Sequence, residues 1–159
     1  MAENDFTLTK DYLHQIFEYK DGELFRLKNG KKVGSNHIKG YKHTAIKGKK
    51  YLLHRLIYMM FNGYFPKEID HINGNRLDSR IQNLRSVTGS QNQQNSKIRK
   101  DNKSGIKGVY WFKELKKWKI DIRFNGKRKY IGVFEDLELA ELVAIEARDK
   151  YHGKFARHN

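Results

Sequence analysis

Residues 68–92 constrain the fold of this chain more than any other stretch. Residues 68–72 can form a short strand that brings Asp70 and His71 to its end, and an Asn-Gly turn follows. A returning strand comes next, and Ser90 can cap a helix that carries Asn92 in its first turn. The expected product is a strand, a loop, a second strand and a helix, with polar side chains gathered at one end.

These side chains are the types that hydrolysis of a phosphodiester needs. His71 has a side chain that titrates near neutral pH, so it can take a proton from water. The carboxylate of Asp70 and the amide oxygen of Asn92 can bind a hard divalent cation, Mg²⁺ or Mn²⁺, that neutralises charge on the phosphate. Asn83 can accept a hydrogen bond from the imidazole and hold it in one tautomer. We therefore expect His71 and Asn83 to be catalytic and Asp70 and Asn92 to be metal ligands.

Each of these residues also has an ordinary structural explanation. Asn83 can be a turn former and Asn92 a polar residue at a helix start, but a purely structural reading is weaker for the whole set. For His54, on a predicted helix face, a structural role is the expectation. Arg76 and Arg85 are expected to contact DNA, with a solvated surface charge as the alternative.

The charge balance of the chain points to a polyanionic partner. The 159 residues include 33 Lys and Arg against 18 Asp and Glu, a formal net charge of +15. Such an excess favours a polyanion such as nucleic acid as the partner, and the hairpin of the second domain, described below, favours double-stranded DNA. The chain has no cysteine, which excludes disulfides and thiolate metal sites.

The sequence shows no targeting or membrane signal. The first residues lack the basic start and apolar run of a signal peptide. The longest apolar stretch, residues 52–61, is interrupted by His54 and Arg55, so we expect no membrane contact. We also expect a cytoplasmic location. No small-molecule cofactor is expected.

The N-terminal part combines helices with hairpins. An amphipathic helix is expected over residues 7–19, and a second one over 53–62. Between them, turns at Asp21-Gly22 and Asn29-Gly30 separate strand-like pieces.

Residues 97–105 are polar, basic and without periodicity, which is typical of a boundary between two units. We expect a first domain over residues 1–98, with the strand–loop–strand–helix core over 66–98. A basic linker over 99–106 and a second domain over 107–159 follow.

The second domain is expected to be a three-stranded antiparallel sheet packed on one helix. Strands are predicted over 108–113, 117–124 and 127–134, the last two joined by a tight Asn-Gly turn. Asp136 should then cap a helix that runs through Tyr151. The expected fold class is therefore α+β throughout.

The register of this hairpin predicts which side chains share a face. An Asn-Gly turn places Arg123 opposite Arg128, Asp121 opposite Tyr130 and Ile120 opposite Ile131. Two arginines across a ladder repel each other in the protein alone, whereas DNA in contact with them makes the pair favourable. The alternative is an open, solvated face. The residues expected to contact DNA from this face are Lys119, Asp121, Arg123, Arg128 and Tyr130, and Trp111 is added as an exposed aromatic side chain.

The first domain resembles the HNH endonucleases of the ββα-metal, or His-Me finger, superfamily. The resemblance rests on His54-Arg55-Leu56, on residues 69–74 (Ile-Asp-His-Ile-Asn-Gly), on residues 83–85 (Asn-Leu-Arg) and on Asn92. It implies a general base at His71, metal ligands at Asp70 and Asn92, and a loop-tying Asn83 that orients His71. Many members have His where this chain has Asn92, and Asn there is similar to the phage-borne, homing-type subgroup.

The second domain resembles the Apetala-type DNA-binding domain of plant ethylene-response factors. Matching stretches are residues 108–109, 118–123, 128–134 and 153–156, with the terminal Asn159. The resemblance implies DNA contacts from Lys107, Asp121, Arg123, Arg128 and Tyr130. Tyr110 and Phe112 replace arginines of the plant proteins and Tyr130 replaces a tryptophan, which concerns the sequence recognised rather than the docking mode.

Together these observations predict a metal-dependent DNA endonuclease, either a monomer that nicks DNA or a DNA-dependent dimer that cuts both strands. One alternative is a non-catalytic DNA-binding regulator, and a second is a structured-RNA binder in which exposed aromatic side chains stack on bases.

Overall fold

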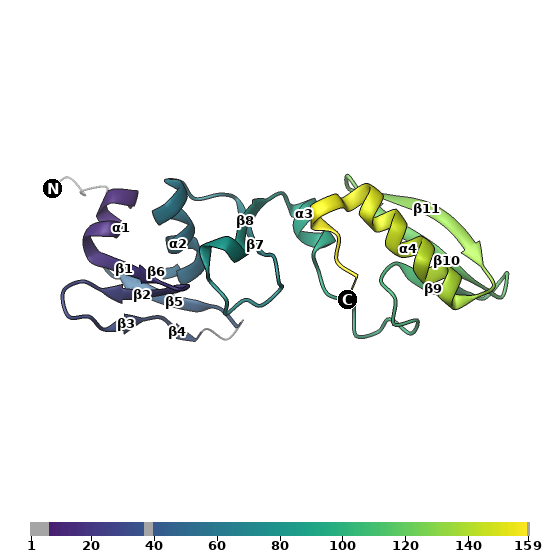
Figure 1. Cartoon of the computed structure of the whole chain (residues 1–159), viewed down its shortest axis with the longest axis horizontal. Coiled ribbons are helices and arrows are strands. Elements are labelled where there is room, and N and C mark those ends of the chain that lie inside the picture. Colours follow the sequence, from purple (N-terminus) through teal and green to yellow (C-terminus); the bar gives the residue numbers. More distant parts are fainter. Residues whose placement is uncertain (1–6, 37–39, 159) are drawn as a thin grey trace. The chain divides into compact units, whose positions relative to one another are not determined.

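The computed structural model describes residues 7–36 and 40–158, and contacts within the chain divide it into two compact units, Met1–Ser86 and Val87–Asn159. Each unit is an α+β fold, as expected (Figure 1). This division precedes the helix that carries Asn92, whereas the expected linker covers 99–106. The expected domain boundaries stay a prediction.

The first unit opens with a short helix and a hairpin. Its elements are α1 (Lys10–Ile16), β1 (Phe17–Lys20), β2 (Glu23–Arg26) and β3 (Lys32–Val33). Thr9 caps α1 by accepting a hydrogen bond from the Tyr12 backbone N–H. The expected helix over 7–19 is too long, because Phe17 has extended φ and ψ angles and starts β1 instead.

A second small sheet and a buried helix complete the core of this unit. The elements are β4 (Ser35–Asn36), β5 (Lys42–Ile46), β6 (Lys49–Leu52) and α2 (Leu53–Asn62). Helix α2 has the predicted bounds and ends at Gly63, whose φ of 79° is left-handed. It packs beside α1 over the strands, and its buried side chains join Leu13, Phe17 and Leu24 in one apolar cluster (Figure 1).

The strand–loop–strand arrangement predicted for residues 68–88 is present. Strand β7 (Glu68–His71) pairs with β8 (Leu84–Val87), and the 3₁₀ turn η1 (Ile81–Asn83) leads into β8. Helix α3 (Gly89–Gln94) follows in the second unit. Its N-cap is Thr88 rather than Ser90, because Thr88 and Gln91 form a reciprocal capping box.

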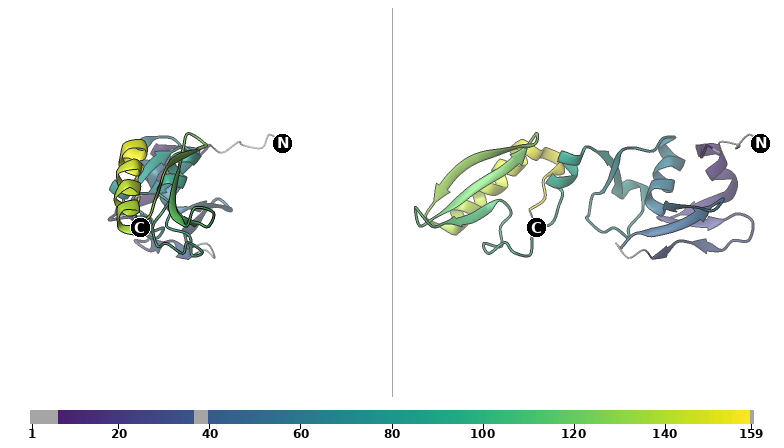
Figure 2. Two further views of the ribbon diagram at one scale, coloured as in Figure 1. Left: turned by 90° about the vertical axis from the view of Figure 1, so that its right-hand side faces the viewer. Right: turned by 180° about the vertical axis from the view of Figure 1, so that it is seen from behind.

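The second unit is the expected three-stranded antiparallel sheet with one helix across a face (Figure 2). Its strands are β9 (Val109–Phe112), β10 (Lys117–Phe124) and β11 (Lys127–Phe134). Helix α4 (Leu137–His152) and the turn η2 (Gly153–Phe155) complete it. Asp136 caps α4 as predicted, and Ala140 and Ala144 pack on Val109 and Ile120.

The register of the β10–β11 hairpin is as predicted up to a β-bulge. Arg123 pairs with Arg128 and Asp121 with Tyr130, but Ile120 pairs with Gly132 rather than with Ile131. The expected Ile120–Ile131 pair is therefore wrong, because one extra residue is inserted in β11 and the alternation is shifted beyond it. No helix in the described part of the chain is long and apolar enough to cross a membrane.

The first hairpin supports the loop that follows β7. Gly22 adopts a φ of +82°, and a Cβ atom there would lie 2.7 Å from the Arg80 backbone nitrogen. The hydroxyl of Tyr19 also accepts a hydrogen bond from the Ile81 backbone N–H at 3.1 Å.

We predict that Gly22→Ala destabilises the protein by about 1–3 kcal/mol more than Gly30→Ala does. Gly30 is the matched control because its φ is +65° and a Cβ there would meet nothing within 4 Å. Both variants carry the left-handed strain, so the difference between their thermal unfolding midpoints isolates the clash with the loop. Equal midpoints would contradict this account.

Candidate active site and nucleic-acid surface

Asp70 and His71 lie buried at the end of β7, with 6% and 5% of their surfaces exposed. Both side chains therefore act in a partly dehydrated environment, where charges interact strongly. Burial lowers the pKa of His71 below its ordinary value, Asp70 and Asp78 partly oppose the shift, and Arg76 adds to it. The His71 imidazole is consequently neutral at neutral pH and can accept a proton.

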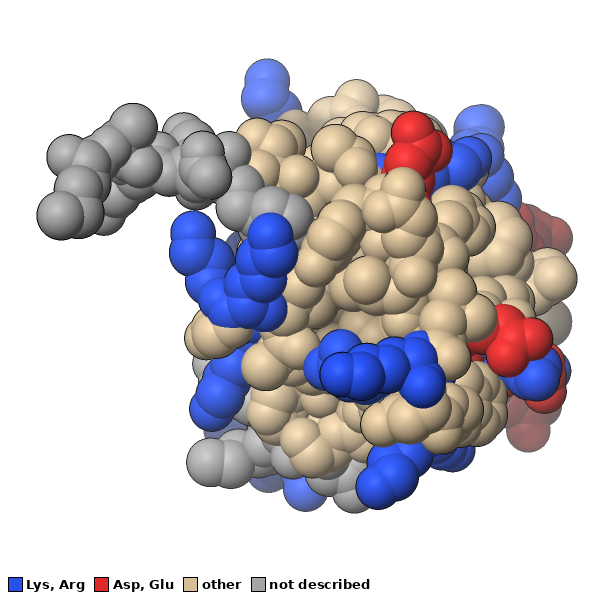
Figure 3. All heavy atoms as spheres, turned by 90° about the vertical axis from the view of Figure 1, so that its left-hand side faces the viewer, with Lys and Arg blue, Asp and Glu red and all other residues tan. Residues whose placement is uncertain are grey.

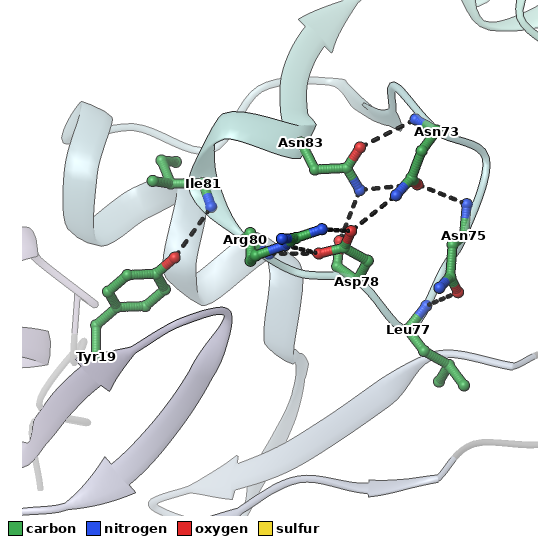
Figure 4. A network of polar contacts seen from close by, with 8 residues as sticks. All are labelled: Tyr19, Asn73, Asn75, Leu77, Asp78, Arg80, Ile81 and Asn83. Atoms are coloured by element: carbon green, nitrogen blue, oxygen red, sulfur yellow. Dashed lines mark hydrogen bonds and ion pairs between the residues drawn. The ribbon is translucent and has the colours of Figure 1, made fainter.

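Asn83 ties the loop that follows His71 (Figure 4). Its amide oxygen accepts from the Asn73 backbone N–H at 3.0 Å, and its amide nitrogen donates to Asn73 Oδ1 at 3.0 Å and to the Asp78 carbonyl at 2.8 Å. Its own carbonyl accepts from the Ile72 N–H at 2.9 Å. The expected loop-tying contacts are present. The hydrogen bonds of the Asn83 amide go to the loop and not to the imidazole, and the backbone of Ile72 connects Asn83 to His71.

The same loop is closed by a second group of polar contacts (Figure 4). The Asp78 carboxylate accepts from Asn73 Nδ2 at 2.7 Å and from Arg80 Nε and Nη2 at 2.9 and 2.7 Å. The Arg80 guanidinium, first, and the Asn73 amide hold the pKa of Asp78 well below its usual range. These contacts of the Asp78 carboxylate hold the loop in place, although the loop contains little regular structure.

Arg85 lies on Asp70. Its Nε and Nη2 atoms lie 2.8 and 2.7 Å from Asp70 Oδ2, and both side chains are largely buried. This ion pair fixes the Asp70 carboxylate, and the expected DNA contact from Arg85 stays a prediction. The pair could not be predicted, because the long loop between β7 and β8 leaves their register open in the sequence.

His54 packs against His71. Their ring centroids are 5.0 Å apart in an edge-to-face arrangement, and Tyr41 lies 5.2 Å from His54 and 6.0 Å from His71. The guanidinium of Arg76 stacks on Tyr41, 5.0 Å from its ring centroid. His54 is buried, and its ring also contacts His71, the expected general base. Tyr41 was missed by sequence reasoning, since nothing in its local sequence marks it.

Asn92 lies within α3 in the second unit, as predicted for a helix-borne amide. No group of three His, Cys, Asp or Glu side chains that could hold a metal ion occurs among the described residues. The expected donor set of one carboxylate and one amide still suits Mg²⁺, which usually keeps water and substrate phosphate among its ligands.

The open face of the second unit carries the predicted row of polar side chains. Pairing in the sheet places Lys119, Asp121, Arg123, Arg128 and Tyr130 on the face opposite α4. Asp121 accepts a hydrogen bond from the Tyr110 hydroxyl, and Arg128 Nη1 lies 3.8 Å from Asp121 Oδ2. The repulsion expected between the two arginines is thus reduced by a neighbouring carboxylate.

Trp111 and Lys107, the other two residues of this unit expected to contact DNA, are not in the row on the open sheet face, and their contact with DNA stays a prediction. Trp111 pairs with Trp118 on the helix side of the sheet, with ring centroids 5.0 Å apart. Lys107 is half-buried, and its ammonium donates to the carbonyls of Gln94 and Ser96 at 2.7 and 2.6 Å. On the first unit, basic side chains are scattered over the face shown in Figure 3 rather than gathered in one patch.

Comparison with known proteins assigns the first of these sites to a family. The model of the HNH endonuclease family matches residues 51–94, which include His54, Asp70, His71, Asn83 and Asn92. Protein 3.8 of Escherichia phage T7 is 38% identical over 108 residues, which cover 65% of this chain and 87% of that protein. The chain belongs to the HNH endonuclease family.

A solved structure of another HNH protein is also similar. The homing endonuclease I-HmuI, described as binding and cleaving DNA, is 30% identical at a TM-score of 0.42. The match covers 50% of this chain and 50% of I-HmuI, so the chain spans about half the length of that protein. The resemblance of residues 107–159 to an Apetala-type domain stays a prediction.

We predict that His54 makes the stability of the protein depend on pH. Burial, and then the nearby His71 and Arg55, lower the pKa of His54 to about 3, against about 6.5 in the unfolded chain. The unfolded state therefore binds more protons between these values, so stability is complete above pH 6.5 and is lost as the pH falls towards 3. Going from pH 7 to pH 5 should cost about 2 kcal/mol through His54 alone.

Urea unfolding of wild type and His54→Phe at pH 7 and pH 5 measures this contribution. Phenylalanine keeps the ring packing and cannot bind a proton, so the variant should lose less stability between the two pH values. An identical loss in both proteins would show that His54 does not titrate in this way.

Proposed function

We propose that this HNH protein is a divalent-metal-dependent DNA endonuclease of the homing type, which hydrolyses a phosphodiester and nicks the duplex. The observation that supports this most is the burial of Asp70 and His71 side by side, at the end of β7 and beside a loop held by Asn83. In this proposal the Asp70 carboxylate is the ligand of the cation, and the neighbouring His71 imidazole, which is neutral at pH 7, is the base.

His71 takes the role of general base. Because its pKa is lowered mainly by burial, its imidazole is neutral at neutral pH and can remove a proton from the attacking water. Packing against His54 and Tyr41 limits the rotation of the ring. The hydrogen bond from the Ile72 N–H to the Asn83 carbonyl fixes the backbone directly after it.

Asp70 and Asn92 would hold Mg²⁺ or Mn²⁺, because a carboxylate and an amide oxygen are ligands that hard cations prefer. When bound, such a cation neutralises the charge that develops on the phosphate and the leaving oxygen. Arg85 makes two contacts with one oxygen of Asp70 and so holds that carboxylate in one rotamer. Arg76 stacks on Tyr41 near His71, and in this proposal it contacts the phosphate.

We assign recognition of double-stranded DNA to the second unit. Its open face carries Lys119, Arg123, Arg128 and Tyr130 on a narrow antiparallel sheet, a shape that fits a major groove. In this proposal residues 1–98 cut, the basic segment 99–106 follows phosphate, and residues 107–159 position the enzyme. One site per chain favours a nick by a monomer, and a DNA-dependent dimer would cut both strands.

We predict that His71→Ala lowers the rate of plasmid cleavage by about 10²–10⁴-fold, which is the usual contribution of a general base. Affinity for DNA should not change, because the imidazole acts only in the reaction. The assay compares the relaxation of supercoiled plasmid in Mg²⁺ and in EDTA, with His14→Ala as the control, since His14 is an exposed histidine on α1.

Retained cleavage by His71→Ala would refute this mechanism. Binding of duplex DNA by the wild type without cleavage under either cation would instead favour the non-catalytic regulator.

We predict that Arg128→Ala weakens binding of duplex DNA. If Arg128 reads a base edge, the loss should be about 1–3 kcal/mol and preference at one base pair should relax. If it contacts a phosphate, the dependence of affinity on salt should fall by about one unit of slope. The control is Lys150→Ala, which removes an exposed charge from α4 on the other side of the sheet. Unchanged binding by Arg128→Ala would rule out the open face as the DNA surface.

A further inference from the structure

We propose that a second site in the C-terminal unit, the cationic cleft formed by Lys107, Arg148 and His152, binds a backbone phosphate of the DNA. The inference rests on the proposed DNA-binding function and adds to it a contact beside the open sheet face. Arg148 and His152 lie outside residues 51–94, which match the HNH family, and outside the stretches that resemble the Apetala-type domain.

The cleft lies between α3 and the segment after it, strand β10 and helix α4, and has a volume of about 480 Å³. The described residues that line it include five basic residues and one carboxylate. That carboxylate, Asp121, already contacts the Tyr110 hydroxyl and the Arg128 guanidinium. The basic residues are Arg99, Lys107, Arg123, Arg148 and His152.

Arg148 is a buried charge held by neutral groups. Only 1% of its surface is exposed, and its Nη1 and Nε atoms donate to the Lys107 carbonyl and to His158 Nδ1. Among the described residues no carboxylate lies within ion-pair distance of it, and Asp149 and Glu141 act on its charge only through space. A buried cation without a counter-ion is unfavourable, so an anion in the cleft would stabilise the arrangement.

Lys107 has a donor left for such an anion. An ammonium group has three N–H donors, and the carbonyls of Gln94 and Ser96 take two of them. Burial, and then repulsion from Arg148 and Arg157, lower the pKa of Lys107 to about 8. The Lys107 ammonium therefore donates hydrogen bonds to two neutral carbonyl groups, which do not neutralise its charge.

His152 supplies the unsatisfied atom of the cleft. It is buried, its Nε2 atom donates to the Arg123 carbonyl at 2.7 Å, and its Nδ1 atom has no hydrogen-bond partner among the described residues. A buried polar atom without a partner is costly in a folded protein. A proton on Nδ1, next to an anion, would turn it into a donor and remove that cost.

The ligand is a phosphate of the same duplex because the cleft and the sheet face share residues. Arg123 and Asp121 line the cleft and also lie in the row of side chains on the open face. A duplex on that face brings its phosphates, spaced along both strands, to the neighbouring basic groups. Contacts of this kind position a protein on DNA without reading its sequence.

The test measures the affinity of the full chain for a short duplex in EDTA, as a function of salt. Lys107→Gln should reduce the slope of log affinity against log salt by about one unit, the effect of one lost phosphate contact. His152→Gln is the second cleft variant, in case Lys107→Gln does not fold by circular dichroism, and should give the same direction. Lys150→Ala, whose charge lies on α4 outside the cleft, should keep the wild-type slope.

A folded cleft variant with the wild-type slope would overturn the proposal. A second arm adds inorganic phosphate: if it raises the melting temperature of the wild type but the duplex slope of the variant is unchanged, the cleft binds a free anion and the DNA contact is refuted. Because no cleavage is measured, failure of this inference leaves the nuclease proposal intact. Absence of duplex binding by the wild type would instead refute the proposed function itself.

Discussion

The hydrogen bonds of one amide, that of Asn83, hold the arrangement on which the proposed active site depends. Strands β7 and β8 are short, and the segment between them has little regular structure. Such a segment gains order only from contacts that outweigh the entropy of fixing it. The three bonds from the Asn83 amide, with the Asp78–Arg80 pair behind them, close the loop around Asn73 and thereby fix the place of His71.

The first unit contains a small apolar core, and the polar residues of the proposed site lie beside it. Helix α2 lies in the core with most of its side chains buried, and the same helix brings His54 to the ring of His71. The geometry of the proposed base is thus tied to the packing of the core. In the second unit the short side chains of Ala140 and Ala144 let α4 approach one face of the sheet closely, and the other face keeps its long basic side chains.

Much of the fold could be predicted from local sequence, because local rules decide it. The bounds of α2, the Asp21-Gly22 turn and the Arg123–Arg128 pair follow from periodicity and turn chemistry. The end of α1 and the N-cap of α3 were misplaced, because competing caps and strand starts differ by a few residues. The Arg85–Asp70 pair, the packing of Tyr41 and the burial of Arg148 could not be predicted, since each joins residues far apart in the chain.

The bulge at Ile131 determines which side chains lie on each face of the sheet in the second unit. In a regular ladder Phe134 would pair with Lys117 and stand among the basic side chains, and Val133 would pack under the helix. The extra residue keeps Phe134 opposite Trp118 in the core and puts Val133 opposite Lys119. Loss of Ile131 alone would leave these pairs as they are. The length of this strand can therefore vary by one residue here without an exchange of its inner and outer surfaces.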